Sequence, residues 1–382
     1  MTALPQLDQR SNISSGGQTF LPSDDSENLQ DSLAPLLPKK VKQSDLIYVT
    51  NQLAIMLETG MTLSVALDAI AEQQENHTLK AILFELKDRV EGGEDFSTAL
   101  TRHPKYFSPT YISLIRSSEQ TGMLGEMLAR LADYMRKSLE TQSKVKAAMA
   151  YPAVMLLMSI GVSIFLLTFI FPKFTPIFTQ RAMKLPLPTT IMMALSDFLL
   201  FYWPLIVLSL IGIGVLWWSR NKLEPIRKGL DWAKIHMPIF GTLMQKVIVS
   251  RSIRTLGTML HSGVSTLEAI KAAGEVSGNY YYQEAWTQIH DHVVQGNRIA
   301  SGLGMFPIFP KTLIQMINAG EETGKIDFVL EKVSNFYDTE VDISIKTATS
   351  LIEPLMIAVM GLIVGGIGMA LMLPIFSLSQ GG

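Results

Sequence analysis

The segment LGTMLHSGVSTLEAIKAA, residues Leu256–Ala273, decides how this 382-residue chain is organised, because it repeats an earlier segment. The earlier segment is LAIMLETGMTLSVALDAI, residues Leu53–Ile70, at an offset of 203 residues. A second pair, SEQTGMLGEML (Ser118–Leu128) and GEETGKIDFVL (Gly320–Leu330), aligns at an offset of 202. Two distant windows at nearly the same offset indicate a duplicated domain of more than 100 residues.

Each copy of the domain is predicted to be helical. Apolar residues recur at helical spacing, as at Leu53, Met56 and Leu57, and no segment shows sustained period-two alternation. Gly60 and Gly263 stand where a helix should stop with a left-handed residue. The predicted helices include 77–91, 97–102 and 108–120 in the first copy and 279–295, 299–303 and 311–321 in the second. The chain is therefore expected to be all-α.

Three long segments carry no charged residue, which indicates an integral membrane protein. They are Ala147–Phe171, Phe198–Ser219 and Pro354–Phe376, and each is long enough to cross a bilayer as a helix. Only 17% of the residues are charged and 48% are apolar, whereas soluble domains have about 25% charged residues. Pro152 and Pro354 stand near the starts of the first and third spans, and we interpret them as helix-start or kink residues.

The distribution of Lys and Arg predicts the orientation of the spans. Basic residues flank the cytoplasmic ends, so the N-terminus is expected in the cytoplasm and the C-terminus outside. The predicted organisation is a disordered cytoplasmic tail (1–44), a first cytoplasmic helical domain (45–150), a first span (151–178), a short extracytoplasmic loop (179–197), a second span (198–219), a second cytoplasmic domain (220–353), a third span (354–376) and an extracytoplasmic tail (377–382).

Two glycines in the third span form a GxxxG pair, Gly361 and Gly365. Such a pair allows two membrane helices to approach closely. The sequence leaves open whether this packing joins spans of one chain or of two copies.

No pattern for catalysis or for metal or cofactor binding emerges. The chain has no cysteine, which excludes disulfides and thiolate metal sites, and its net charge of −2 argues against nucleic-acid binding. Residues 320–326 resemble a phosphate loop but have three residues between the glycines and Ile326 where Ser or Thr should bind magnesium. His290 and His292 are two residues apart, so they lie on different sides of a helix and do not predict a metal site.

The pattern of these motifs resembles the type II secretion F family. The repeat around Gly60 and Gly263, the GEETG motif at Gly320–Gly324, and a helix leading to a proline at a membrane span carry the resemblance. The resemblance covers about residues 45 to 376. Family members are inner-membrane platform proteins of type II secretion systems and type IV pili. In copy one Gln120 replaces the second glutamate of the motif, and residues 1–40 replace the family's usual N-terminal segment.

The resemblance implies a scaffold that couples a cytoplasmic hexameric ATPase to the assembly of pilin or pseudopilin subunits, without hydrolysing nucleotide itself. It also implies contact with other inner-membrane assembly components and with membrane lipid, and association with further copies of the chain, all in a bacterial inner membrane. No cofactor is expected. The residues expected to fix domain geometry or to contact a partner are those of the two motifs: Glu119, Thr121, Gly122, Glu321, Glu322, Thr323 and Gly324.

Two other classes of function were weighed against the scaffold. A transporter or permease subunit would need ionisable groups at mid-membrane, which all three predicted spans lack. A membrane enzyme would need a catalytic constellation, which the sequence does not show. For the three motif glutamates, the sequence allows either surface charge at a turn or a contact or cation site between helices.

Overall fold

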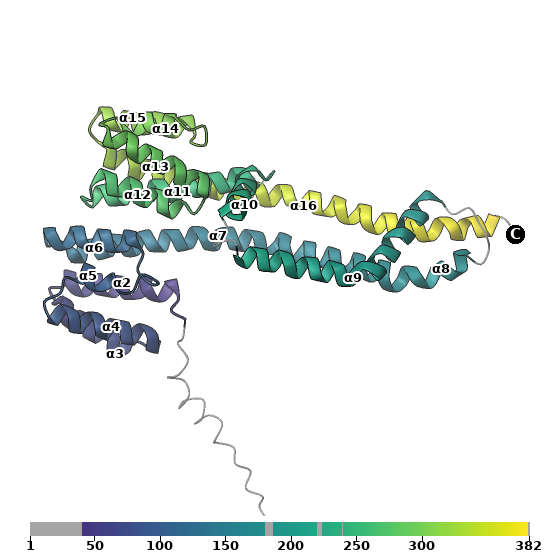
Figure 1. The fold of residues 1–382 in the computed structure, drawn as a ribbon, viewed down its shortest axis with the longest axis horizontal. Helices are drawn as coiled ribbons and strands as arrows, with labels where there is room; N and C mark the ends of the chain where they lie inside the picture. The colour runs from purple at the N-terminus through teal and green to yellow at the C-terminus, as the bar shows by residue number, and fades with distance from the viewer. Residues whose placement is uncertain (1–39, 180–185, 220–223, 239, 381–382) are drawn as a thin grey trace, which may run out of the picture.

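The computed structural model describes residues 40–179, 186–219, 224–238 and 240–380, and this part of the chain is helical throughout, without a strand (Figure 1). The all-α prediction is therefore confirmed for the described residues. Nearly all of the predicted N-terminal tail, and residues 180–185 of the predicted loop, lie outside them. So do residues 381 and 382 of the predicted C-terminal tail.

The two copies of the repeat have the same order of helices. The first copy consists of α2 (Gln43–Glu58), α3 (Leu63–Gln73), α4 (His77–Glu91), α5 (Phe96–Leu100), α6 (Pro109–Thr121) and the start of α7 (Leu124–Phe165). The second consists of α11 (Phe240–His261), α12 (Thr266–Ser277), α13 (Tyr280–Val294), α14 (Ile299–Gly304), α15 (Lys311–Glu322) and the start of α16 (Ile326–Gln380). An extra helix, α10 (Glu224–His236), precedes the second copy.

The helix ends follow the local chemistry of the sequence. Gly60 and Gly263 adopt positive φ angles of 90° and 74°, which residues with a side chain rarely adopt, so both glycines end a helix as predicted. At the start of α12 the Ser265 hydroxyl accepts a hydrogen bond from the backbone N–H of Glu268, which satisfies one of the free donors of the first turn.

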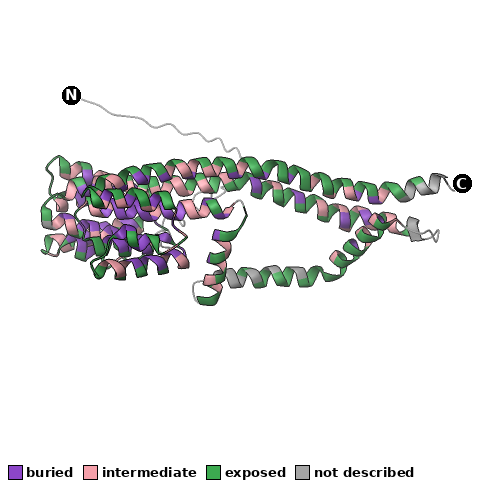
Figure 2. Cartoon of the chain, turned by 90° about the horizontal axis from the view of Figure 1, so that it is seen from above, coloured by how far each residue is buried: buried purple, intermediate pink, exposed green. Residues whose placement is uncertain are grey.

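Equivalent residues of the two copies form equivalent cores. Leu53 and Leu256 are both buried, as are Leu128 and Leu330. The second core also contains Trp286, whose ring packs edge-on against Phe309 with centroids 5.5 Å apart. The repeated apolar pattern thus encodes the same packing twice. Figure 2 shows the buried residues concentrated in the two helical bundles, at the left of the view.

The last helix of each copy extends without a break into an apolar segment. α7 passes through Pro152 and α16 passes through Pro354. Of the two alternatives for these prolines, a helix start is therefore excluded, and a kink within a continuous helix stays a prediction. Each proline lies well inside a helix, where the backbone continues although one hydrogen bond is lost.

Two of the helices are long and apolar enough to cross a membrane. The segments are 124–176 and 326–373, with mean hydropathies of 2.6 and 2.4 over the best window, and only 17% of each window is buried within the chain. The first segment contains a π-helical turn, η2 (Leu166–Ile170), followed by α8 (Phe171–Thr179). A third apolar helix, α9 (Leu187–Ser219), begins eleven residues before the predicted second span, so residues 187–197 are helical rather than irregular.

Side-chain hydroxyls join the apolar helices to one another. The hydroxyl of Ser196 in α9 donates to the carbonyl oxygen of Leu167 at 2.6 Å, within the π-helical turn where regular pairing is interrupted. Thr189 donates in the same way to Ala370 of α16 at 2.8 Å. No described atom lies within 4 Å of a Cβ built on Gly361 or Gly365, so the described part of this chain does not use their close-approach surface.

The packing of α12 against α13 predicts the effect of one substitution. A Cβ on Gly274 would lie 2.9 Å from the Cβ of Trp286, which is buried in the second core. We expect Gly274→Ala to lower the stability of the purified protein by about 1–3 kcal/mol, measured by thermal unfolding in detergent. Gly229→Ala is the control, because nothing lies near a Cβ there and the helix α10 gains about 0.5–1 kcal/mol. Equal melting temperatures for the two variants would contradict this packing.

Candidate functional site

The first glutamate of the GEETG motif holds the start of a neighbouring helix in its own copy. One carboxylate oxygen of Glu321 accepts from the backbone N–H of Ile299 at 2.7 Å, and the other accepts from Ala300 at 2.9 Å. These are free donors of the first turn of α14, where the helix dipole also favours a negative charge. Glu321 therefore joins α15 to α14 across 22 residues of sequence.

The equivalent residue of the first copy makes the equivalent contact. A carboxylate oxygen of Glu119 accepts from the backbone N–H of Ser97 at 3.1 Å, at the start of α5. Neither copy of this position lies at a metal site, since the described residues contain no group of three or more suitable ligands. Of the two interpretations that the sequence allowed for Glu119 and Glu321, the structure favours a contact between helices, and the contact lies within one domain.

The remaining motif positions end the helices that carry the glutamates. The hydroxyls of Thr121 and Thr323 donate to carbonyl oxygens three and four residues earlier. Gly122 and Gly324 adopt positive φ angles of 73° and 64°. Each motif thus forms a tight turn immediately before α7 or α16, at the end of the molecule away from the apolar halves of these helices (Figure 1).

Glu322 differs from the half-buried Glu119 and Glu321 because its side chain is 54% exposed. It accepts hydrogen bonds from Arg298 at 3.3 Å and from Asn318 at 3.0 Å. An exposed ion pair contributes little to stability. Glu322 and Arg298 are therefore available to a partner without cost to the fold, whereas Glu321 is not.

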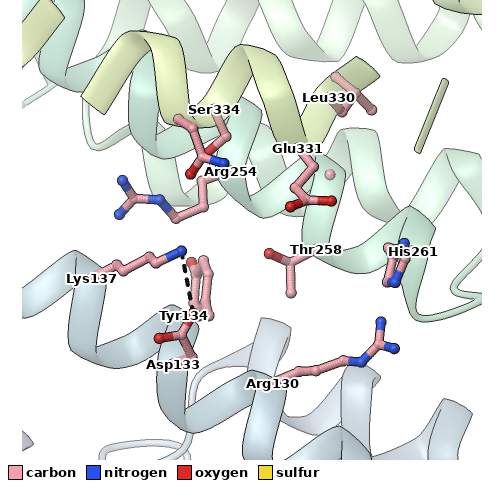
Figure 3. A pocket seen from close by; sticks show the side chains of 12 residues that line it. Arg130, Asp133, Tyr134, Lys137, Arg254, Thr258, His261, Leu330, Glu331 and Ser334 are labelled. Atoms are coloured by element: carbon pink, nitrogen blue, oxygen red, sulfur yellow. Dashed lines mark ion pairs between the residues drawn. The ribbon is translucent and has the colours of Figure 1, made fainter. Parts of the chain in front are cut away.

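A groove that the sequence did not predict lies between the two copies. It has a volume of about 280 Å³ and is lined by residues of α7, α11 and α16 (Figure 3). Tyr134, which lines the groove, has its hydroxyl 2.9 Å from the hydroxyl of Thr255, and Ser117 of the first copy donates to the carbonyl oxygen of Ser262 in the second at 3.1 Å. Farther along the two long helices, Lys144 of α7 forms an ion pair with Asp342 of α16 at 2.8 Å. These contacts fix how one copy sits on the other.

Buried arginines stabilise the second copy's side of this contact. Arg254 forms an ion pair with Asp338, which also accepts from the Ser250 hydroxyl at 2.7 Å. Arg251 lies beside them, donates to the carbonyl oxygen of Val276 at 3.5 Å, and has its pKa lowered mainly by burial. Arg254 therefore joins α11 to α16 and Arg251 joins α11 to α12, so the two charges are used within the second copy.

The geometry does not assemble a reaction centre in the described residues. The segment 320–326 that resembles a phosphate loop is a turn between two helices, with no strand before it. Of the two histidines, His292 faces the Ser301 hydroxyl at 3.0 Å and His290 faces Asp291, so they do not converge. The arrangement is suited to holding helices and presenting surfaces.

The contrast between the two motif glutamates can be tested by stability. We expect Glu321→Ala to cost about 1–3 kcal/mol, because two backbone donors lose a charged partner, and Glu321→Gln to cost less. The matched control Glu322→Ala should change stability by less than about 0.5 kcal/mol. Thermal unfolding of the purified variants measures both, and an equal loss for Ala at the two positions would contradict the capping role.

Comparisons with known proteins agree with this architecture. The sequence model of the family described as "Type II secretion system (T2SS), protein F" matches residues 49–172 and again 252–374, one match for each copy. The chain is 37% identical to the type IV pilus assembly protein PilC of Myxococcus xanthus over 340 residues, covering 89% of this chain and 81% of that protein. It is 38% identical to PilC of Thermus thermophilus, covering 90% and 85%. It is 30% identical to the type II secretion system protein F of Aeromonas hydrophila, covering 90% and 89%. With two matching domains and relatives along nearly its whole length, the chain belongs to the protein F family of type II secretion and type IV pilus systems.

Proposed function

We propose that this protein is the inner-membrane platform on which a type IV pilus or a type II secretion pseudopilus is assembled. The relatives named for pilus assembly are more similar to this chain than the one named for secretion, and both kinds align over most of its length. The observation that carries the proposal is the continuity of α7 and α16, each of which begins inside a folded helical domain and ends in an apolar segment.

In this role the chain couples a cytoplasmic hexameric ATPase to the insertion of pilin subunits into a fibre. A displacement imposed on either helical domain along the helix axis moves the apolar half of the same helix, because the two are parts of one continuous helix. The chain itself supplies no nucleotide site in this scheme. That is consistent with the helix-to-helix turn found at residues 320–326.

The proposed topology has three spans, namely α7–α8, α9 and α16, with both helical domains and the N-terminus in the cytoplasm. The exposed apolar side chains of the spans, such as Leu157 and Leu362, would face lipid and pilin helices. α9 has 33 residues and a length of about 50 Å, so it extends beyond a hydrocarbon layer of about 30 Å unless it tilts.

The exposed pair Glu322–Arg298 offers a test of ATPase contact that leaves the fold intact. We expect the charge reversals Glu322→Lys and Arg298→Glu to weaken co-purification of the assembly ATPase from detergent-solubilised membranes by about tenfold, which corresponds to roughly 1.4 kcal/mol. Their melting temperatures should stay at the wild-type value. Glu284→Lys is the matched control, since it reverses an exposed charge on α13 of the same copy.

Two results would contradict the proposed function. One is ATP hydrolysis by the purified protein alone. The other is the absence of any pilin-like protein and of any secretion-type ATPase among the partners identified by mass spectrometry. Substrate uptake by reconstituted vesicles would instead support a transporter.

A further inference from the structure

The contact between the two copies is made by different faces of each copy. The second copy contributes one stripe of α11 together with α16, and the first contributes α6 and α7. On α11 the stripe consists of Arg251, Thr255, Thr258 and Ser262, which bond to or line pockets with Ser117, Arg130, Tyr134 and Thr141 of the first copy.

The reciprocal contact is not made within the chain. The repeat maps Thr255 onto Gln52 and Tyr134 onto Phe336, so a two-fold arrangement would place Gln52 against Phe336. Instead Tyr48, on the same stripe as Gln52, is 59% exposed and Phe336 is 42% exposed. The copies are therefore stacked head to tail, which leaves one face of each kind unused.

The α2 stripe, defined as Tyr48, Gln52, Ile55 and Thr59, is the unused counterpart of the α11 stripe. At these positions the covered copy carries Arg, Thr, Thr and Ser, whereas the uncovered copy has Tyr and Ile at two of them. Ile55 is 54% exposed, and the Gln52 side-chain oxygen is buried without a hydrogen-bond partner among the described residues. A free face that is more apolar than its covered counterpart is typical of a contact surface.

The α16 stripe, defined as Lys332, Phe336 and Ile343 of α16 with Ala319 of the preceding α15, is the unused counterpart of the α6–α7 face. Phe336 replaces Tyr134, and Ile343 replaces Thr141 and is 50% exposed. Both unused faces thus present an aromatic ring and an isoleucine where the faces already in contact present more polar residues. These two faces correspond in backbone position to the two sides of a contact that the chain already makes.

We propose that chains of this protein associate head to tail, with the α2 stripe of one chain docked on the α16 stripe of the next, repeating the contact made between the copies within each chain. The equivalent of the Tyr134–Thr255 contact is then Phe336 of one chain against Gln52 of the next. Tyr48 and Ile55 are covered by the same contact, with Ile55 beside Lys332 as Thr258 is beside Arg130.

The membrane limits what such an assembly can look like. A head-to-tail contact generates either a closed ring or an open filament. If all chains cross one membrane in the same direction, as proposed above, the rotation between neighbours must be about an axis near the membrane normal. Where that rotation is a whole fraction of a full turn, the head-to-tail contact closes into a ring whose cytoplasmic face alternates first and second copies.

Because the chain has no cysteine, crosslinking provides a direct test on the full-length protein in membranes. Differently tagged chains carrying Gln52→Cys and Phe336→Cys are co-expressed and oxidised. We expect a product at twice the 42.3 kDa chain mass that contains both tags. Tyr134→Cys with Thr255→Cys in one chain is the positive control, and Gln288→Cys, on the exposed side of α13, replaces Phe336→Cys in the negative control.

Three outcomes would overturn the proposal. One is the absence of the mixed product while the Tyr134–Thr255 control forms. Another is a dominant product that joins two chains both carrying Gln52→Cys, as a two-fold contact requires. The third is a crosslink from the Gln52→Cys chain to a different protein only. None of these results bears on ATPase co-purification by the wild-type chain, so failure here is distinguishable from failure of the platform function.

A charge exchange tests the same contact without oxidation. Ile55→Lys places a second positive charge beside Lys332 of the next chain, so we expect the association in detergent to weaken about tenfold or more, measured by mass photometry over a dilution series. Adding Lys332→Glu to the same chain should restore it. Loss of association without rescue by the double variant would contradict the pairing of these two residues.

Discussion

Two unbroken helices, α7 and α16, determine where everything else in the molecule can be. The first part of each helix packs into the core of a helical domain, with Leu128 and Leu330 at equivalent places in the two cores. Each helix then continues as a long apolar segment, which we call a rod. The two rods pack side by side and are tied by Lys144 and Asp342. The orientation of each domain relative to the membrane is therefore set by a helix and not by a linker.

The repeated motif fixes the position of α7 and α16 at their first turns, at the end of each helix opposite its apolar half. Glu119 and Glu321 fasten the short helices α5 and α14 to the turn from which each rod begins. The glycine that follows lets the chain reverse within a few residues. A motif that could be taken for a binding loop thus fixes the starting direction of a long helix, and only Glu322 retains an exposed carboxylate for other contacts.

The order, ends and capping of the helices could be predicted from the sequence because they depend on neighbouring residues, as at Gly263 and Ser265. The hydrogen-bond partners of Glu321 could not be predicted from the sequence. They are the backbone N–H groups of Ile299 and Ala300, which almost any residue at those positions would offer. For Pro152 and Pro354 the sequence left a helix start and a kink both open, and the structure places each proline inside a long helix, because a proline there costs one hydrogen bond and does not end the helix. The groove at Tyr134 depends on how the copies stack, which no single copy encodes.

The same prolines give each rod a place of mechanical weakness. In α7 the carbonyl of Ala148 and in α16 that of Ser350 stand four residues before a proline, so neither receives the helical hydrogen bond that holds the adjacent turns together. Resistance to bending falls where that bond is missing. Each rod therefore transmits rotation and push along its axis, while it yields sideways at its proline near the start of the apolar half.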